Sequence, residues 1–304
     1  MLGHQKIFAD LQSLARGNAL SHAYLFHGPS MVGKKRAARM LAEYLESEGL
    51  EQRLKKDERS GVVSPIGHYA STAEENAILN DCTMIEPMNG SIGIDAVREI
   101  KNFLWQKPNA SPRRTLVIDD AELLTAEAQN ALLKITEEPP ESSLLILVAA
   151  DAEALMPTLL SRLEKVYFGL VPEREIAAWL GARKKEKGTR DKESFPIQRS
   201  MGKPGLAWRL VHDEELKKNI ALAENFLKSQ PATRRDFIKK LIEPEEFDLN
   251  RFLDAVIMVL AWNRTGNQKP ATGNRLWHKA LALREREANF SLNPRLQLEN
   301  LLSV

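Results

Sequence analysis

The sequence of 304 residues has one cysteine, few aromatic residues and almost no net charge. Cys82 alone cannot form a disulfide within the chain or build a multi-cysteine zinc site, so we expect no metal site. We interpret Cys82 as a small buried apolar residue in preference to a reactive thiol, because free cysteines are among the most buried residues. The formal net charge of +2 is too small to indicate nucleic-acid binding by itself.

Long apolar runs are also missing. No stretch approaches the roughly 20 apolar residues of a membrane-spanning helix, so we expect no membrane partner. The first residues include an aspartate and lack the apolar segment of a signal peptide, and we therefore expect a cytoplasmic protein. The length suffices for two or three domains with cores of their own.

The first half of the chain alternates apolar segments with amphipathic ones. Buried strands are predicted at residues 23–28, 82–87, 115–119 and 144–150, and helices at 3–17, 34–48, 94–106 and 125–138. This alternation predicts an α/β domain with a parallel sheet. Residues 49–75 are rich in charges and turn residues and are predicted to be a surface excursion.

Only helical patterns follow Phe168. We therefore predict an α/β domain at 1–168, a small helical domain at 169–211 and a helical bundle at 212–304.

A glycine-bearing loop follows the first predicted strand. Gly28, Gly33 and Lys34 fit the pattern G-x-x-x-x-G-K, in which backbone N–H groups surround a phosphate and the lysine neutralises its charge. The next position should carry a Ser or Thr hydroxyl for Mg²⁺, but it is Lys35, a cation that repels a metal. The loop is a glycine turn without a ligand, a site that holds ATP or ADP weakly without good metal chemistry, or a complete ATPase site. The sequence therefore establishes no cofactor.

Two acids end a predicted strand. Asp119 follows four apolar residues at the edge where open α/β sheets bind ligands, and an acid there can hold Mg²⁺. Asp120 stands where a glutamate would orient the attacking water, and a misplacement of about 1 Å can cost roughly a hundredfold in rate. Alternatively, both carboxylates cap the following turn and face water.

Several cations are candidates for binding surfaces. Ser161 and Arg162 end a short predicted helix, and in isolation Arg162 would be an ordinary surface charge. Basic residues recur at Arg113, at Arg114 and in segment 183–187. They form either a solvated face or contacts with the phosphate backbone of duplex DNA.

The sequence resembles the clamp loaders, a family of AAA+ ATPases. The segments that carry the resemblance are SHAYLFHGP at 21–29, NALLKITEEPP at 130–140, TLLSRL at 158–163 and FSLNPRLQLENLL at 290–302. The resemblance implies an AAA+ core, a helical lid and a helical collar for oligomerisation in the three predicted domains. It fails at 49–75, where members usually carry a four-cysteine zinc module, and His68 alone cannot replace that module.

Departures from the family pattern favour a delta-prime type of subunit over the ATP-hydrolysing gamma/tau type. Besides Lys35 and Asp120, the sensor-1 position falls at Ala149 and the position of the sensor-2 arginine at Gly205. With four catalytic positions changed, we expect no intrinsic ATPase activity, or very little. Gly28, Gly33, Lys34 and Asp119 would then form a vestigial nucleotide site.

The Ser161–Arg162 pair is retained. In the family this arginine reaches into the ATP site of the adjacent subunit, and such an arginine finger is worth about 10³–10⁵ in rate. The resemblance therefore implies a non-hydrolysing clamp-loader subunit of DNA replication, part of a DNA polymerase III assembly. Its expected partners are gamma/tau-type and delta-type subunits, the sliding clamp and the backbone of primer-template DNA. The alternatives are a gamma/tau-type motor subunit of the same ring and a stand-alone adaptor for DNA binding or repair.

Overall fold

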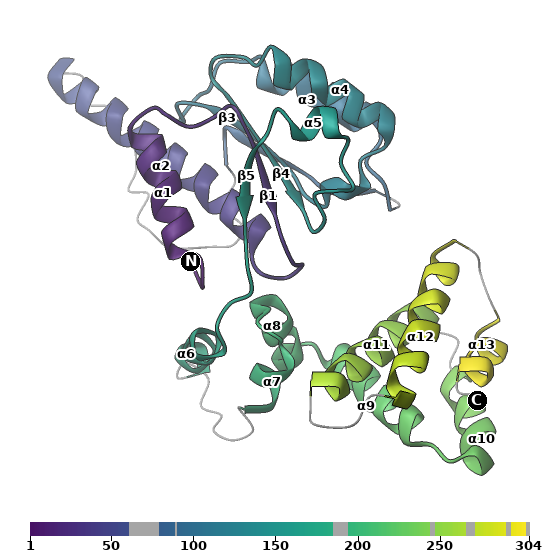
Figure 1. Cartoon of the computed structure of the whole chain (residues 1–304). Coiled ribbons are helices and arrows are strands. Elements are labelled where there is room, and N and C mark those ends of the chain that lie inside the picture. Colours follow the sequence, from purple (N-terminus) through teal and green to yellow (C-terminus); the bar gives the residue numbers. More distant parts are fainter. Residues whose placement is uncertain are drawn as a thin grey trace. The chain divides into compact units, whose positions relative to one another are not determined.

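The computed structural model describes residues 1–60, 79–88, 90–184, 194–243, 247–265, 271–289 and 293–301 (Figure 1). The chain divides into two compact units, Met1–Leu206 and Ala207–Val304. The three domains expected from the sequence, with boundaries at 168 and 211, stay a prediction.

The first unit is built on a five-stranded parallel sheet in the order β2-β3-β4-β1-β5. The strands are β1 Ala23–His27, β2 Cys82–Ile85, β3 Arg114–Ile118, β4 Ser143–Ala149 and β5 Glu164–Tyr167. Every residue of β3 and β4 is buried, as expected for central parallel strands that are covered on both faces. The parallel register brings the carboxyl ends of the strands to one edge. The predicted α/β class with a parallel sheet, followed by helices, is confirmed.

Two apolar clusters cover the two faces of this sheet. One contains side chains of α1 Gln5–Arg16 and α2 Lys34–Ser60. The other contains side chains of α3 Ile94–Leu104, the 3₁₀ turn η1 Ala121–Leu123, α4 Ala126–Glu137 and α5 Pro157–Leu160. Figure 1 shows α3, α4 and α5 on the face of the sheet opposite to α1 and α2. Thr125 caps α4 as predicted, because its side chain accepts a hydrogen bond from the Ala128 N–H.

Two local predictions need correction. Helix α2 continues to Ser60, so the surface excursion predicted from residue 49 is helical for its first part. Residues 50–60 are mostly Leu, Glu, Gln, Arg and Lys, which are good helix formers. The many charges in this segment made it resemble a surface loop in the sequence. The rest of that excursion, with His68, lies outside the described residues. Strand β5 and the short helix α7 Ser194–Arg199 were not predicted.

Helices alone follow the sheet in the described part of the chain. The first unit continues with α6 Glu173–Lys184, α7 and the start of α8 Pro204–His212. The second unit contains α9 Glu214–Lys228, α10 Pro231–Ile242, α11 Leu249–Thr265, α12 Ala271–Asn289 and α13 Pro294–Leu301. None of the helices in the described ranges is both long and apolar enough to cross a membrane.

Candidate functional site

The predicted phosphate loop joins β1 to α2. Gly28, Met31 and Gly33 have φ angles of +128°, +63° and +104°, so the backbone turns repeatedly through the left-handed region. Such turns direct successive N–H groups toward one side and form anion-binding nests. A Cβ atom at Gly28 would lie 2.2 Å from the carbonyl oxygen of Phe168, so only glycine fits there. The loop has the backbone shape that the motif predicts.

Lys34 is turned onto its own loop. Its Nζ donates to the carbonyl oxygens of Gly28 and Pro29, both at 2.7 Å, and the residue is only 7% exposed. Burial lowers the pKa of Lys34, although the nearby carboxylates, Glu122 first, work in the opposite direction. The ammonium group therefore holds the loop together from within.

Lys35 joins two strand ends. Its Nζ lies 3.0 Å from Oδ2 of Asp119 and also forms an ion pair with Oε1 of Glu86. The side chain of Asp119 is 14% exposed and that of Glu86 is 62% exposed. Burial by itself would lower the pKa of Lys35, but the hydrogen bonds with Glu86 and Asp119 outweigh it and the pKa is raised.

These residues do not fit a magnesium ion. Mg²⁺ in such loops takes the Ser or Thr hydroxyl after the lysine and is held by the acid at the strand end. Position 35 offers an ammonium in place of the hydroxyl, and the same ammonium is bound to the Asp119 carboxylate. In the described ranges no group of three or more His, Cys, Asp or Glu residues is placed to hold a metal ion.

The acids beside Asp119 are crowded. Burial raises the pKa of Asp120, and the charges of Asp119 and Glu122 raise it further. Asp120 has a left-handed φ of +46° and makes no side-chain cap to η1, so the predicted cap is wrong for this residue, but its side chain is exposed to water as that alternative expected.

Glu122 was missed by the sequence reasoning. Its Oε1 accepts from the Ala150 N–H at 3.1 Å, and its buried Oε2 has no hydrogen-bond partner in the described chain. The sequence signal that could have identified Glu122 is its position three residues after Asp119, on the turn that follows the strand.

Two further positions meet the site from other elements. The N–H of Gly205, at the start of α8, donates to the carbonyl oxygen of Met31 in the loop at 2.9 Å. A Cβ atom at Gly205 would lie 3.1 Å from both Cβ and O of Met31, so a larger side chain would have to displace the loop. Ala149 ends β4 and is buried, and its methyl group offers no hydrogen bond to a phosphate.

Arg162 is separate from this cluster. Its Nη2 forms a 2.7 Å ion pair with Oε1 of Glu137 at the end of α4, and its Nη1 donates to the Thr158 carbonyl at 2.6 Å. Ser161 accepts a weaker bond from Nη1 at 3.3 Å and donates to the same carbonyl, so it orders the end of α5. The structure therefore brings Lys34, Lys35 and Asp119 together and leaves Arg162 held on α4 and α5. The side chain of Arg162 is 34% exposed.

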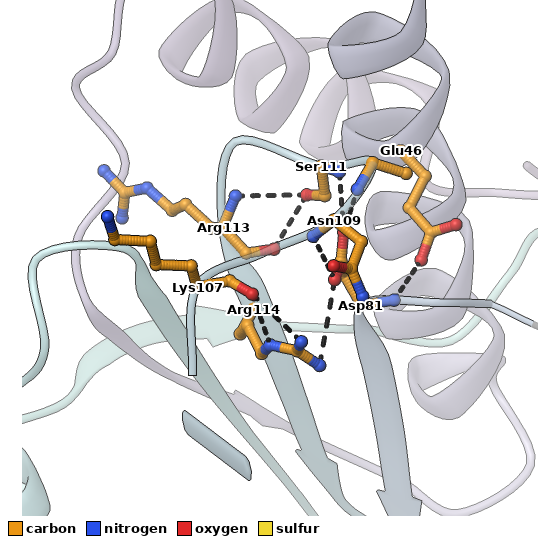
Figure 2. Close-up of polar contacts among 8 residues, drawn as sticks. Glu46, Asp81, Lys107, Asn109, Ser111, Arg113 and Arg114 are labelled. Carbon is orange, nitrogen blue, oxygen red and sulfur yellow. Dashed lines mark hydrogen bonds and ion pairs between the residues drawn. The ribbon is translucent and has the colours of Figure 1, made fainter. Parts of the chain in front are cut away.

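The prediction that Arg114 lies on a solvated or DNA-contacting face is wrong. Arg114 is 6% exposed, donates to the Lys107 carbonyl, and lies 3.8 Å from the buried carboxylate of Asp81 (Figure 2). Arg113 is half-buried, and its Nη1 donates to the Ser21 carbonyl at 3.2 Å. The side chains of segment 183–187 lie outside the described residues.

Cys82 lies in β2 and packs against the apolar cluster under α1 and α2 as a small apolar residue, although it is only partly buried. Burial raises the pKa of its thiol to about 12, and the charge of Glu46 acts in the same direction. A thiol with this pKa is a weak nucleophile at neutral pH.

Comparisons with known proteins place this arrangement in a family. The sequence profile of the family described as "DNA polymerase III, delta subunit" matches residues 3–171, which is more than half of the chain. The delta' subunit of Escherichia coli K12 is 31% identical over 147 residues, or 48% of this chain and 43% of that protein. The gamma/tau subunit of Mycobacterium tuberculosis H37Rv is 30% identical over 192 residues, or 59% of this chain and 30% of that protein.

The match therefore spans less than half the length of these two curated relatives. A crystal structure of a DNA polymerase III gamma subunit-related protein from Thermotoga maritima has the same fold, with a TM-score of 0.62 and 20% identity. It covers 96% of this chain and 97% of its own. Together with the clamp-loader segments in the sequence, the profile match shows that the chain belongs to the DNA polymerase III delta-subunit family.

Proposed function

We propose that the chain is a non-hydrolysing, delta-prime-type subunit of the DNA polymerase III clamp loader. It donates Arg162 in trans to the ATP site of a neighbouring gamma/tau-type subunit and helps to load the sliding clamp on primed DNA. The observation that carries the non-hydrolysing part is the ion pair between Lys35 and Asp119. Family membership and the delta' and gamma/tau relatives support the assembly.

The charges in the loop disfavour hydrolysis at this chain's own site. An ATPase of this type uses Mg²⁺ to neutralise the developing charge on the phosphates and a positioned acid to orient water. Here an ammonium is bound to the metal-holding acid, and the pKa of Asp120 is raised by burial and by neighbouring acids. The arginine expected near the loop is Gly205, which packs on Met31. Each feature lowers the expected turnover of this chain's own site.

The ion pair between Arg162 and Glu137 is partly exposed to water. The side chain of Glu137 is 49% exposed, and exposed ion pairs contribute only about 0.2–1 kcal/mol. A guanidinium is always charged and can bind phosphate oxygens in a bidentate manner. A triphosphate brought close by a neighbouring subunit can therefore compete with Glu137 for Arg162. This supports the donor role in trans, with ATP bound by the neighbour.

Reconstitution tests this role. The chain is assembled with gamma/tau-type and delta-type subunits, and ATP turnover is measured with the sliding clamp and primer-template DNA. Arg162→Ala should leave the complex assembled and lower the DNA-stimulated turnover. Arg39→Ala is the matched control, since Arg39 also pairs with a partly exposed glutamate, Glu43. Unchanged turnover with Arg162→Ala contradicts the donor role.

The second candidate is a gamma/tau-type motor subunit, favoured by the preserved backbone of the loop and by the gamma/tau relatives. ATP hydrolysis by the purified chain, abolished by Lys34→Ala, would support it. If the chain captures no clamp-loader subunit in a binding assay, the stand-alone adaptor is favoured instead.

A further inference from the structure

The Lys35 ion pairs are built into the sheet edge. Ile85 pairs with Ile118 in the parallel register of β2 and β3, so Glu86 and Asp119 follow their strands side by side. The Asp119 N–H donates to the Ile85 carbonyl at 2.9 Å, which fixes the backbone between them. Lys35 stands in the first turn of α2 and reaches both carboxylates. Lys35 is therefore an internal cation that pairs with the acids at the ends of two neighbouring strands, Glu86 and Asp119.

We infer that Lys35 is a resident counter-ion of Asp119 that excludes divalent metal from the phosphate loop. Any nucleotide binding by this chain is therefore independent of Mg²⁺. The inference deepens the proposed function and rests on it only in taking the chain as non-hydrolysing. It names the residue that separates this loop from a metal-dependent one.

Three physical effects exclude the metal. A mostly buried carboxylate is stabilised by a bound cation, and the ammonium at 3.0 Å already supplies it. A divalent ion at the same oxygen would stand within a few ångströms of the ammonium, where like charges repel strongly in a partly buried site. Magnesium also demands near-octahedral oxygen ligands, and Lys35 contributes none.

The other charged groups around the loop do not make up for the missing metal ion. Lys34 is held by the carbonyl oxygens of Gly28 and Pro29, and Asp120 and Glu122 lie near it. The carboxylates around the loop therefore outnumber the ammonium groups, and a metal-free polyphosphate gains little from them. Lys35 is the one side chain here whose replacement both frees Asp119 and, as threonine, supplies the missing hydroxyl.

The test uses the full chain and ADP as the probe. Affinity is measured by calorimetry in excess Mg²⁺ and in excess EDTA, for the wild-type chain, Lys35→Thr and Arg36→Thr. Arg36→Thr is the matched control, because it removes a positive charge from the next residue of the same helix. For the wild-type chain and for Arg36→Thr, we expect ADP affinities that agree within about twofold in the two buffers, or no binding in either buffer. We expect Lys35→Thr to bind ADP at least about tenfold more tightly with Mg²⁺ than with EDTA, which corresponds to about 1.4 kcal/mol of binding free energy.

Each outcome of this experiment either supports or overturns the inference about Lys35. A wild-type chain that binds ADP more tightly with Mg²⁺ overturns the inference, and this measurement does not depend on any variant folding. A folded Lys35→Thr chain, checked by circular dichroism, that shows no Mg²⁺ dependence also overturns it. The donor role of Arg162 is tested separately in the ring. Unchanged ring turnover with Arg162→Ala, beside a gain of Mg²⁺ dependence with Lys35→Thr, contradicts the donor role and supports this inference.

Discussion

The substitution Asp81→Asn tests how the region before β2 is anchored. Figure 2 shows the Asp81 carboxylate among backbone N–H groups of the loop that precedes β3. Oδ1 accepts from Asn109 at 2.7 Å, and Oδ2 accepts from Ala110 at 2.5 Å and Ser111 at 2.7 Å. The Asp81 N–H donates to Glu46 of α2 at 2.7 Å. Asp81, next to the start of β2, thus connects to α2 through its N–H and to the loop before β3 through its carboxylate.

The expected cost follows from these contacts. Whichever way the amide introduced by Asp81→Asn would turn, at least one buried N–H would face an NH₂ group, which costs about 1–3 kcal/mol. Arg114 would also lose its buried counter-ion, and removing one partner of a buried pair costs roughly 3–5 kcal/mol. Arg114 keeps its hydrogen bonds to the Lys107 carbonyl, which reduces the second cost. We therefore expect Asp81→Asn to lower the free energy of unfolding by about 3–5 kcal/mol in total. Domains are typically stable by about 5–15 kcal/mol, so the first unit would lose at least about a fifth of its stability.

Hydrogen exchange is the suitable assay, because a chain of two units need not unfold in one step. Exchange of the Asn109, Ala110 and Ser111 amides should become much faster in Asp81→Asn, and the urea midpoint of the first unit should fall. Asp95→Asn is the control, since Asp95 is 90% exposed and pairs with the exposed Arg98. A loss below about 1 kcal/mol for Asp81→Asn, with protection of the loop amides retained, would refute this reasoning.

Three further outcomes are expected. Gly49→Ala should destabilise the first unit by about 1–3 kcal/mol although alanine favours helices, because a Cβ atom at position 49 would lie 2.1 Å from the Ala110 carbonyl oxygen. Thermal unfolding measures this loss, and a gain in stability would contradict the contact. Cys82, with its pKa of about 12, should react with a disulfide reagent at pH 8 about a thousandfold more slowly in the native chain than in urea. Thr125→Ala should cost about 0.5–2 kcal/mol and Thr125→Ser much less, because only a hydroxyl can accept from the Ala128 N–H; equal losses in the two variants would show that the cap does not stabilise α4.

The strands that sequence patterns predicted well are the buried ones. The pattern of β4 is continuous apolar side chains, which is typical of a strand covered on both faces. Strand β5 has exposed residues at three of its four positions and lies at the sheet edge, so its sequence carries little of that signal. Its position depends on pairing with β1, which is a tertiary contact.

The candidate site was predictable as a set of residue types and not as a set of contacts. The motif located Gly28, Lys34 and Asp119, and it identified Lys35 as the wrong residue for a metal. The motif could not show that Lys35 binds Asp119, nor that Glu86 shares it, because this depends on β2 lying next to β3. The role of Asp81 had no sequence signal either, since a single acid before a strand usually faces water.

The two cations that decide the proposed function differ in how they are held. Lys35 is bound by two carboxylates, one of which is mostly buried, so releasing it would leave a charge with little access to water. Arg162 also bonds to the Thr158 carbonyl and to Ser161, but its one carboxylate partner is half exposed, so water can replace that carboxylate at little cost. A nucleotide approaching from outside therefore meets a cation paired with a mostly buried acid in this chain's own loop, and a cation paired with a half-exposed acid at the end of α5. This difference favours a subunit that acts on a neighbour's nucleotide over one that hydrolyses its own.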